Sequence, residues 1–544
     1  MPRRQACYRD TVNIRLADHE ILVRHSQGCV GAAIAEGPSS FVIGEILPPP
    51  VTEPGVLSVY ARLIEGFAQA RVAWCYWKSS RRADAALAGE TDLDILVAPA
   101  CLHDARRALL ECGFRLFSPV ADRADPSIEC YLHFDEPSGR IAHVDLYARL
   151  TLGGTLRKTH RLPWVDSLIR RSAPRGGLRM PLLDAASEAV MLVVRASLEL
   201  RRSDPVAALN WGRMRRKFEL DRALLAERVD REAVRSRAAE LVDQKIAAQI
   251  ADAFFDSRPL HKQPERRRRL RRAFSSYRTC GALEGFARDT SRCLRAAAGK
   301  LNRRALHWPR PWNRRVPGGG IVVAVLAVDG AGKSTLVRGI REWLDREVDV
   351  LPLYFGTGDG RQSWFLTPLK LFVPLVSRLL RRKPRGSSHG VVTDRAPGFV
   401  YSFLLTIWAT VLAVEKRTKI HAAHRAAGRG MVVITDRFPQ DEILDFNDGP
   451  LLPRLAHVPG FLRTFEASAY SLARKLRPDL VIKLVASPEL IAAREPTMDA
   501  GVIHARTEAV GRLTLGGASV TAIPASQSVA DVLRAAQIKI WRSL

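Results

Sequence analysis

The chain has 544 residues, enough for about three domains at ~100–200 residues each. Hydrophobic residues make up 47% and charged residues 26%, a balance that is typical of globular proteins and argues against a disordered chain. The 84 Lys and Arg exceed the 56 Asp and Glu and leave a net charge of +28. Such a charge favours polyanionic partners (nucleotides, nucleic acid or anionic lipid headgroups) without choosing among them.

The cysteines and the N-terminus bear on the compartment. None of the eight cysteines lies in a CxxC or Cys/His spacing that would indicate a zinc site. Scattered cysteines in a large chain are typical of buried thiols in a reducing compartment, and the first twenty residues lack the apolar segment of a signal peptide. We therefore expect a cytoplasmic protein.

Taken in chain order, the sequence predicts five regions. Residues 1–55 carry no readable motif and end in the Pro-rich break Pro48–Gly55. Residues 56–180 predict a small mixed α/β domain, and residues 181–300 an Arg- and Ala-rich helical region. A basic linker, 301–320, leads into a C-terminal α/β domain, 321–544. The expected elements of the first α/β domain are a helix at Leu57–Ala70, a strand at Val72–Trp77, a strand at Asp92–Ala98, a helix ending at Gly113 and a strand at Ile141–Leu150.

Three further segments bear on membranes and polyanions. Gly398–Val414 has 17 residues without a charge, which is the short edge of a membrane-spanning helix. A buried core helix is the alternative that we favour, because the segment leads directly into motifs of the C-terminal α/β domain. The clusters His261–Arg272 and Trp308–Gly320 are interpreted as basic linkers, with contact to nucleic acid or to an anionic membrane surface as the alternative.

A glycine-rich loop opens the C-terminal domain. Ile321–Val328 is a continuous apolar run, typical of a strand buried on both faces of a parallel sheet, and it leads into DGAGKST (Asp329–Thr335) and a helical segment. In this context the backbone N–H groups of the loop cradle phosphates, the lysine reaches the β- and γ-phosphates and the serine hydroxyl binds Mg²⁺. The expected ATP-binding residues are Gly330, Ala331, Gly332, Lys333, Ser334 and Thr335.

The C-terminal domain resembles thymidylate kinase. The resemblance rests on DGAGKST, on MVVITDRF (Met431–Phe438) and on PDLVIKLVASPELIAAR (Pro478–Arg494), which occur in the family's order within about 220 residues. It implies a parallel sheet flanked by helices, with ATP and Mg²⁺ as cofactors.

The resemblance also implies roles for individual residues. Asp436 would organise Mg²⁺ and Arg437 would face the phosphates, so that Lys333, Asp436 and Arg437 form the catalytic set. A second Asp-Arg pair, Asp394-Arg395, is the less favoured alternative. The acceptor is expected at Asp329 and at Lys416 or Arg417, and the lid arginines among Arg494, Arg506 and Arg512.

The departures from the family concern the acceptor. The phenylalanine on which the family stacks thymine is replaced by Leu412 or Ala413, and the loop that carries a further phosphate arginine reads YFGTGDGRQSWF (Tyr354–Phe365) here. A pocket without these partners binds a thymine nucleotide less well. The sequence therefore predicts ATP-dependent phosphoryl transfer to a nucleoside monophosphate or related phosphorylated acceptor more firmly than it predicts dTMP.

Paired carboxylates mark the N-terminal domain. Asp92 and Asp94 in GETDLDILV share one face of a strand, and Asp145 lies on a later strand. Carboxylates in this arrangement bind Mg²⁺. The pattern resembles the nucleotidyltransferase fold, in which such residues bind two metal ions, but the family's upstream Gly-Ser is WKSS here, with Lys78 in place of the glycine.

Three functions stay open at this point. The first is the phosphoryl transfer described above, with a small-molecule acceptor and no nucleic-acid partner. The second is a bifunctional nucleotidyltransferase–kinase, because WKSS, GETDLDILV, YFGTGDG and FNDGPLL also resemble two-domain proteins of bacterial surface-polysaccharide assembly. The third is a non-catalytic nucleotide-binding protein.

Overall fold

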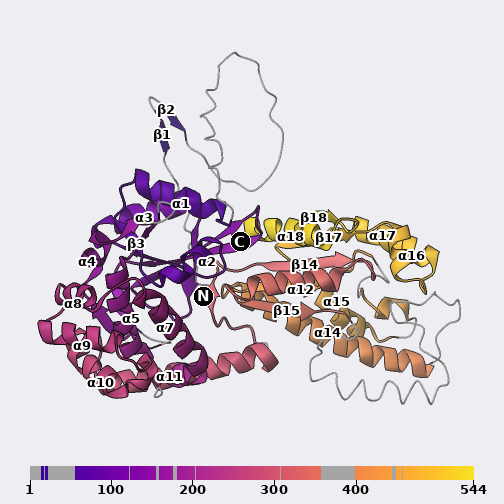
Figure 1. Cartoon of the computed structure of the whole chain (residues 1–544). Coiled ribbons are helices and arrows are strands. Elements are labelled where there is room, and N and C mark those ends of the chain that lie inside the picture. The colour runs from indigo at the N-terminus through magenta and orange to yellow at the C-terminus, as the bar shows by residue number, and fades with distance from the viewer. Residues whose placement is uncertain are drawn as a thin grey trace, which may run out of the picture. The chain divides into compact units, whose positions relative to one another are not determined.

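The computed structural model of the chain describes residues 14–16, 19–21, 55–121, 123–154, 158–174, 180–201, 204–306, 308–356, 399–443, 449–455 and 458–544. The chain divides into two compact units, Met1–Pro48 and Pro49–Leu544. Within the first unit, β1 (Ile14–Leu16) and β2 (His19–Ile21) pair antiparallel. All other described helices and strands belong to the second unit (Figure 1).

The first part of this unit is built on a seven-stranded mixed sheet with the order β11-β12-β3-β4-β8-β7-β5. The two central strands are parallel and place Asp94 opposite Asp145. The strands are β3 (Trp74–Tyr76), β4 (Leu93–Val97), β5 (Arg115–Leu116), β7 (Ile128–Asp135), β8 (Arg140–Tyr147), β11 (Ala173–Pro174) and β12 (Pro181–Leu182). The helices are α1 (Ser58–Gln69), α2 (Ala83–Leu87), α3 (Leu102–Glu111) and α4 (Val165–Arg170).

The predicted elements of this part are present, together with further strands. β8 ends at Tyr147, three residues before the end of the strand that we expected. The chain then forms the short strand β9 (Leu150–Leu152), which pairs with β10 (His160–Leu162). β7, which the sequence analysis did not predict, forms a hairpin with β8. Gly139 closes that hairpin at φ 70°, a left-handed conformation that glycine adopts without strain.

The middle of the chain is helical, as predicted. α5 is buried along almost its whole length, and the carboxylate of Asp184 caps it by accepting a hydrogen bond from the Ser187 N–H. α5 spans Ala185–Glu199. The other helices of this region are α6 (Pro205–Leu209), α7 (Trp211–Ala226), α8 (Arg231–Ala239), α9 (Gln244–Phe254), α10 (Pro264–Ala273) and α11 (Ala282–Leu301).

The basic cluster His261–Arg272 belongs to this helical region and is not a linker. Most of it forms α10, and Arg267 is buried there. The Arg271 guanidinium donates a hydrogen bond to the Ser197 carbonyl of α5, 2.9 Å away. These arginines thus hold helices together by satisfying backbone carbonyls, which composition alone cannot distinguish from a solvated basic segment.

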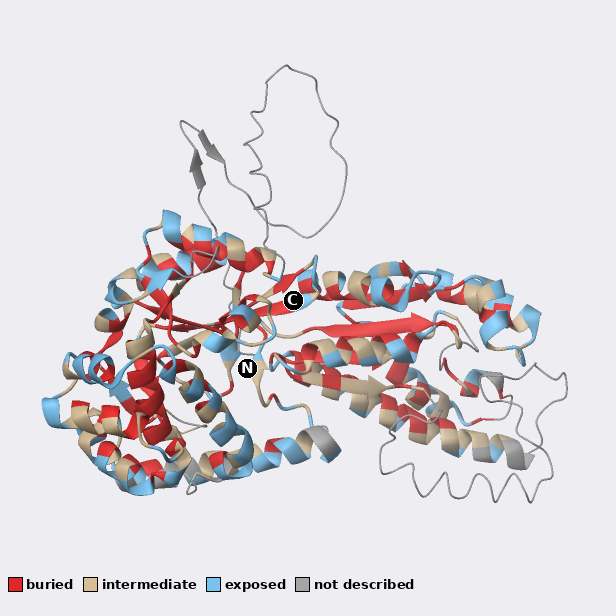
Figure 2. Cartoon of the chain, viewed as in Figure 1, coloured by how far each residue is buried: buried red, intermediate tan, exposed pale blue. Residues whose placement is uncertain are grey.

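The C-terminal part is a five-stranded parallel sheet with the order β15-β16-β14-β17-β18, and this confirms the predicted fold class. Every residue of the central strand β14 is buried (Figure 2). The strands are β14 (Val322–Ala327), β15 (Val350–Tyr354), β16 (Val432–Asp436), β17 (Leu480–Val485) and β18 (Ser519–Pro524). The helices are α12 (Lys333–Leu344), α14 (Phe399–Ala427), α15 (Gly460–Lys475), α16 (Pro488–Arg494), α17 (Ala500–Arg512) and α18 (Val529–Ser543).

Residues 399–414, the described part of the uncharged stretch, form the first half of α14. Ala409, Leu412 and Ala413 are buried there, whereas Phe403, Ile407 and Val414 are exposed, so this half of the helix is only partly a core helix. Among the described residues, no helix combines the length and the apolar character that crossing a membrane requires.

An aromatic cluster joins the two sheets. Trp541 of α18 stacks on Phe117 with ring centroids 5.9 Å apart, and its ring lies 6.1 Å from that of Phe134 on β7 and 6.5 Å from that of Trp343 on α12. Leu132, Phe134 and Ile141 of the N-terminal sheet thus belong to the same hydrophobic core as the C-terminal sheet, while other buried residues of the N-terminal sheet pack in two further clusters. Aromatic pairs of this geometry stabilise a core beyond the area that they bury.

Trp541→Ala should therefore destabilise the whole second unit. Removing a buried tryptophan deletes its contacts and leaves a cavity, a loss of about 3–5 kcal/mol in the free energy of unfolding. Equilibrium urea unfolding, followed by fluorescence and by circular dichroism, measures this loss. Trp308→Ala is the control, because the Trp308 side chain is largely exposed; equal unfolding midpoints for the two variants would contradict the joining role of the cluster.

Candidate functional site

The loop between β14 and α12 has the backbone of a phosphate-binding loop. Gly330 and Gly332 have φ values of 85° and 93°, in the left-handed region where other residues are strained. A side chain at Gly330 would also meet Glu495, because a Cβ atom there would lie 2.8 Å from its Cγ. α12 begins immediately after this loop, at Lys333, so the free N–H groups of its first turn and the positive end of its dipole are available to an anion.

Lys333 lies between two carboxylates. Its ammonium is 3.6 Å from Asp329 Oδ1 and 3.7 Å from Asp436 Oδ1, and its side chain is only 7% exposed. Asp436 is the last residue of β16, which pairs with β14 and so brings the acid to the loop. The predicted lysine and acid of the catalytic set are therefore neighbours at the carboxyl edge of the sheet, where ligands of open α/β sheets bind.

Arginines surround the same loop. Arg437 adopts the left-handed φ of 66° and donates a hydrogen bond from Nη2 to Asp329 Oδ1 over 2.8 Å. Arg506 Nη1 lies 3.6 Å from Asp329 Oδ2, and Arg494 Nη1 donates to the Gly330 carbonyl. Two of the three predicted lid arginines thus lie at the loop, and the excess of positive charge there suits a polyphosphate.

The residues at this loop fit a magnesium ion and the phosphates of a nucleotide. Asp436 Oδ1 is buried and has no hydrogen-bond partner among the described residues, so it keeps its capacity to bind a cation or a water molecule. Burial raises the pKa of Asp436, and the nearby Lys333 acts in the opposite direction. Ser334 and Thr335 are exposed in the first turn of α12, where their hydroxyl groups are accessible to a ligand.

The predicted acceptor residues on α14 make other contacts. Lys416 is buried and donates a hydrogen bond to the Tyr470 hydroxyl, 2.7 Å away. Arg417 donates to the Ser468 hydroxyl at 2.6 Å. Both partners lie on α15, so the contacts that the structure shows for Lys416 and Arg417 pack two helices together, and an acceptor role for either stays a prediction.

Several other candidates lie away from the loop or outside the described residues. Arg512, the third lid candidate, lies 3.7 Å from Glu508 on its own helix. Asp394, Arg395 and residues 357–365 are outside the described part of the chain.

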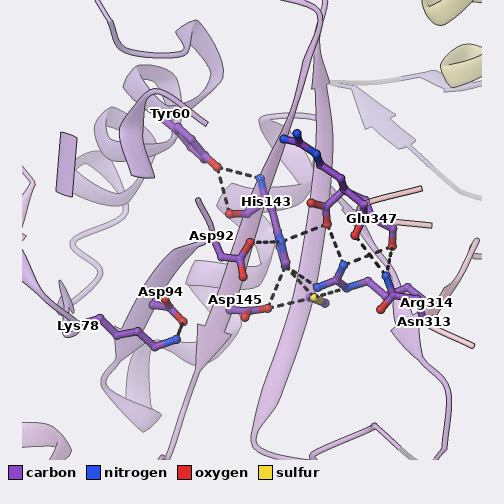
Figure 3. A network of polar contacts seen from close by, with 11 residues as sticks. Tyr60, Lys78, Asp92, Asp94, His143, Asp145, Asn313, Arg314 and Glu347 are labelled. Atoms are coloured by element: carbon purple, nitrogen blue, oxygen red, sulfur yellow. Dashed lines mark hydrogen bonds and ion pairs between the residues drawn. The ribbon is translucent and has the colours of Figure 1, made fainter. Parts of the chain in front are cut away.

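The three N-terminal carboxylates share one region of the sheet, where two of them contact the same histidine and the third contacts a lysine (Figure 3). Asp94 forms an ion pair with Lys78. Asp92 Oδ1 lies 2.8 Å from His143 Nδ1, and Asp145 Oδ1 lies 3.1 Å from Nε2 of the same ring. The imidazole ring of His143 therefore lies between Asp92 and Asp145, two of the expected metal ligands. The ammonium group of Lys78 contacts the third, Asp94.

His143 is buried next to carboxylates that favour its protonated form. Burial works against protonation, but the adjacent Asp145 and Asp92 raise the pKa of His143 well above its ordinary value. In turn, burial opposes ionisation of Asp145, but His143 holds the pKa of that carboxyl below its usual range. The charges of this cluster thus stabilise one another.

Two residues from near the C-terminal sheet complete the cluster (Figure 3). Glu347 Oε2 lies 3.2 Å from His143 Nδ1 and accepts a hydrogen bond from Arg314 Nη1 over 2.8 Å. Arg314 also donates from Nε to the Cys130 sulfur and approaches His143 Nε2 at 3.2 Å. Arg314 lies in the segment that the sequence predicted as a basic linker, and here β13 (Arg314–Arg315) pairs with β6 (Ser118–Pro119).

These residues do not fit the divalent metal that the paired carboxylates led us to expect. Oδ1 of each of the three carboxylates already contacts Lys78 or His143, so a magnesium ion would compete with these side chains for the carboxylates. The described residues contain two groups whose possible ligand atoms all lie within 4.8 Å of one another, one of Cys130, His143 and Asp145 and one of Asp92, His143 and Glu347. Neither group unites the three carboxylates.

A cavity of about 410 Å³ opens beside Asp94. Lys78, Arg82 and Lys217 line it together with Ser79. Burial, with Arg195 and Lys78 adding to it, lowers the pKa of Lys217 to about 8. Asp92 and Asp94 also line the cavity, so its walls carry three basic side chains against two acidic ones.

Sequence reasoning missed His143, Glu347, Arg314 and Lys217. His143 had a local signal, because it stands two residues before Asp145 on the same strand face. The other three come from distant parts of the chain, and no spacing in the sequence connects them to the carboxylates. Of the two serines in WKSS, Ser79 lines the cavity, whereas the backbone N–H of Ser80 donates a hydrogen bond to Glu188.

Comparison with known proteins gives relatives for part of the chain. No protein-family model matches it. It is 25% identical over 227 residues to the uncharacterized ATP-binding protein YghS of Escherichia coli K12, which covers 41% of this chain and 93% of the relative. It is 26% identical over 237 residues to the uncharacterized ATP-binding protein YghR of the same strain, which covers 42% of this chain and 88% of the relative. The chain is thus similar over about two fifths of its length to proteins named for ATP binding, and these two relatives have no counterpart of the rest.

Proposed function

We propose that residues 321–544 bind ATP and transfer its γ-phosphate to a small phosphorylated acceptor, of which a nucleoside monophosphate is the first candidate. The observation that carries the proposal is the position of Lys333, held at the glycine loop between Asp329 and Asp436. The similarity to proteins named for ATP binding supports the nucleotide half of the proposal. Phosphoryl transfer rests on the arrangement of the side chains.

Each side chain has a role that follows from its position. The loop N–H groups and Lys333 would hold the phosphates of ATP, and Arg437, Arg494 and Arg506 would face them. Asp436 and Ser334 would hold Mg²⁺, which would neutralise the charge that develops during transfer. Arg437 now bonds to Asp329, and an anion at the loop would compete with Asp329 for this arginine.

The contacts of these residues favour nucleotidyl transfer and non-catalytic nucleotide binding less than they favour phosphoryl transfer. Metal-dependent nucleotidyl transfer needs metal ions at Asp92, Asp94 and Asp145, and protein cations contact all three. A non-catalytic nucleotide-binding role would not require an acid such as Asp436, with a buried oxygen free of hydrogen bonds, next to the lysine. Phosphoryl transfer uses both of these residues.

Lys333→Ala tests the proposal directly. Loss of the cation that stabilises the transferring phosphate should lower kcat by about 10²-fold or more. The measurement is ADP formation by the full chain with ATP, Mg²⁺ and a panel of nucleoside monophosphates and sugar phosphates. Arg338→Ala is the matched control, because it removes an exposed cation from the same helix.

A Lys333→Ala rate within tenfold of the wild-type rate would contradict the kinase proposal. A wild-type protein that binds ATP but forms no ADP with any member of the panel would favour the non-catalytic alternative.

A second prediction concerns dTMP. Leu412 and Ala413, which stand where the family has its thymine-stacking phenylalanine, are both buried aliphatic residues in α14. A base without its stacking partner loses binding energy in the transition state, so dTMP should be a poor acceptor although ATP binding persists. The measurement is kcat/KM for dTMP. A value near ~10⁵ M⁻¹s⁻¹, ordinary for an enzyme and its own substrate, would show that the protein is a thymidylate kinase.

A further inference from the structure

The cavity beside Asp94 has the properties of a ligand site of its own. We propose that it binds a small phosphorylated ligand directly through protein cations, without a divalent metal ion. This site lies in the N-terminal sheet region and is separate from the ATP site at Lys333. It takes the place of the metal-dependent site that the paired carboxylates predicted.

The charges of the cavity favour an anion. Lys78 follows β3, Arg82 ends a short 3₁₀ helix at Ser80–Arg82 and Lys217 comes from α7, so three separate segments each direct a cation to one space. Lys78 is paired with Asp94, and the other acid of the lining, Asp92, is in contact with His143. Arg82 and Lys217 therefore remain as positive charge that no acid of the lining offsets.

Ser79 provides independent evidence for a ligand. Its side chain is only 4% exposed and lines the cavity, yet its hydroxyl group has no hydrogen-bond partner among the described residues. A buried hydroxyl without a partner is uncommon, because its desolvation is not compensated. A phosphate oxygen in the cavity would accept the hydrogen bond that Ser79 offers.

The size of the cavity fits a small ligand. Its volume of about 410 Å³ lies within the range of small-molecule sites, ~300–1,000 Å³. Phosphate oxygens form their strongest contacts with guanidinium and ammonium groups, such as Arg82 and Lys217 provide. Inorganic pyrophosphate and a monosaccharide phosphate share this chemistry, and they serve as the two probes.

Calorimetric titration of the full chain with these probes tests the proposal. The starting protein carries Lys333→Ala, so that the P-loop contributes little, and the buffer contains EDTA. We expect pyrophosphate to bind at submillimolar concentration, and Lys217→Met and Arg82→Met each to weaken it by at least about tenfold, the effect of losing one charge-assisted hydrogen bond. Arg216→Met, at an exposed position of α7 next to Lys217, should leave binding unchanged.

The two probes separate the sources of the phosphate. Binding of a monosaccharide phosphate tighter than that of pyrophosphate would identify a phosphate ester as the ligand class, and the reverse order an inorganic or diphosphate group. Thermal unfolding shows which variants are folded, and Arg82→Met, on a partly exposed side chain, decides the question if Lys217→Met does not fold.

Three results would overturn the proposal. The first is the absence of binding at millimolar concentrations of both probes. The second is binding that folded Lys217→Met and Arg82→Met proteins retain in full. The third is binding that requires added Mg²⁺ and disappears in Asp94→Asn, which would restore the metal site.

Discussion

The pairing of buried charge around His143 is the constraint on which the arrangement of the two sheets depends. The imidazolium side chain is 4% exposed, and a buried ion without a counter-charge costs several kcal/mol. Asp92 and Asp145 come from the N-terminal sheet, while Glu347 comes from the C-terminal part of the chain. Separating the two sheets would leave Glu347 and His143 each short of a partner, so the cluster favours one relative position.

The helix α12 connects this cluster to the phosphate-binding loop. Lys333, its first residue, lies in the loop, and Glu347 stands in the turn just after its last residue, held by a hydrogen bond from the Glu347 N–H to the Leu344 carbonyl. A helix transmits a displacement of one end to the other because its backbone hydrogen bonds leave little freedom between them. The phosphate-binding loop and the His143 cluster are therefore mechanically joined, whereas the sequence suggested two domains separated by a linker.

The parts of the fold that the sequence predicted are those with local causes. The P-loop, its strand and its helix follow from a continuous apolar run, two glycines and a lysine within fifteen residues, and the structure has them as expected. The helical region likewise follows from its periodic pattern. β7 was missed although it has a local signal, because Ile128, Cys130, Leu132 and Phe134 alternate with more polar residues as in a half-buried strand, and its pairing with β8 completes the hairpin.

In the candidate sites, too, residues with a local signal could be predicted, whereas residues that only the tertiary fold brings together could not. Lys333 and Asp436 are 103 positions apart, and in the sequence only the order of the family's motifs links them. The parallel pairing of β14 with β16 is the physical reason that they lie together. Lys416 and Arg417 were predicted as acceptor residues from their distance in sequence to the Asp-Arg pair. Such a distance does not show which face of α14 packs on α15. Glu347 and Arg314 have no local signal, because the positions of their partners depend on the complete tertiary fold.

The Asp-x-Asp pattern shows how far a motif can determine chemistry. Alternation along β4 ensures that Asp92 and Asp94 share a face, and the register with β8 brings Asp145 beside them, so the sequence predicts a concentration of negative charge. It does not predict which cation neutralises that charge. Lys78, which replaces the family's glycine, places an ammonium on Asp94 from only sixteen positions away, and His143 of β8 contacts Asp145 on its own strand and Asp92 just before β4. Because these protein cations are fixed by the fold, the same three carboxylates that hold metal ions in one protein can serve here to orient basic side chains toward a ligand.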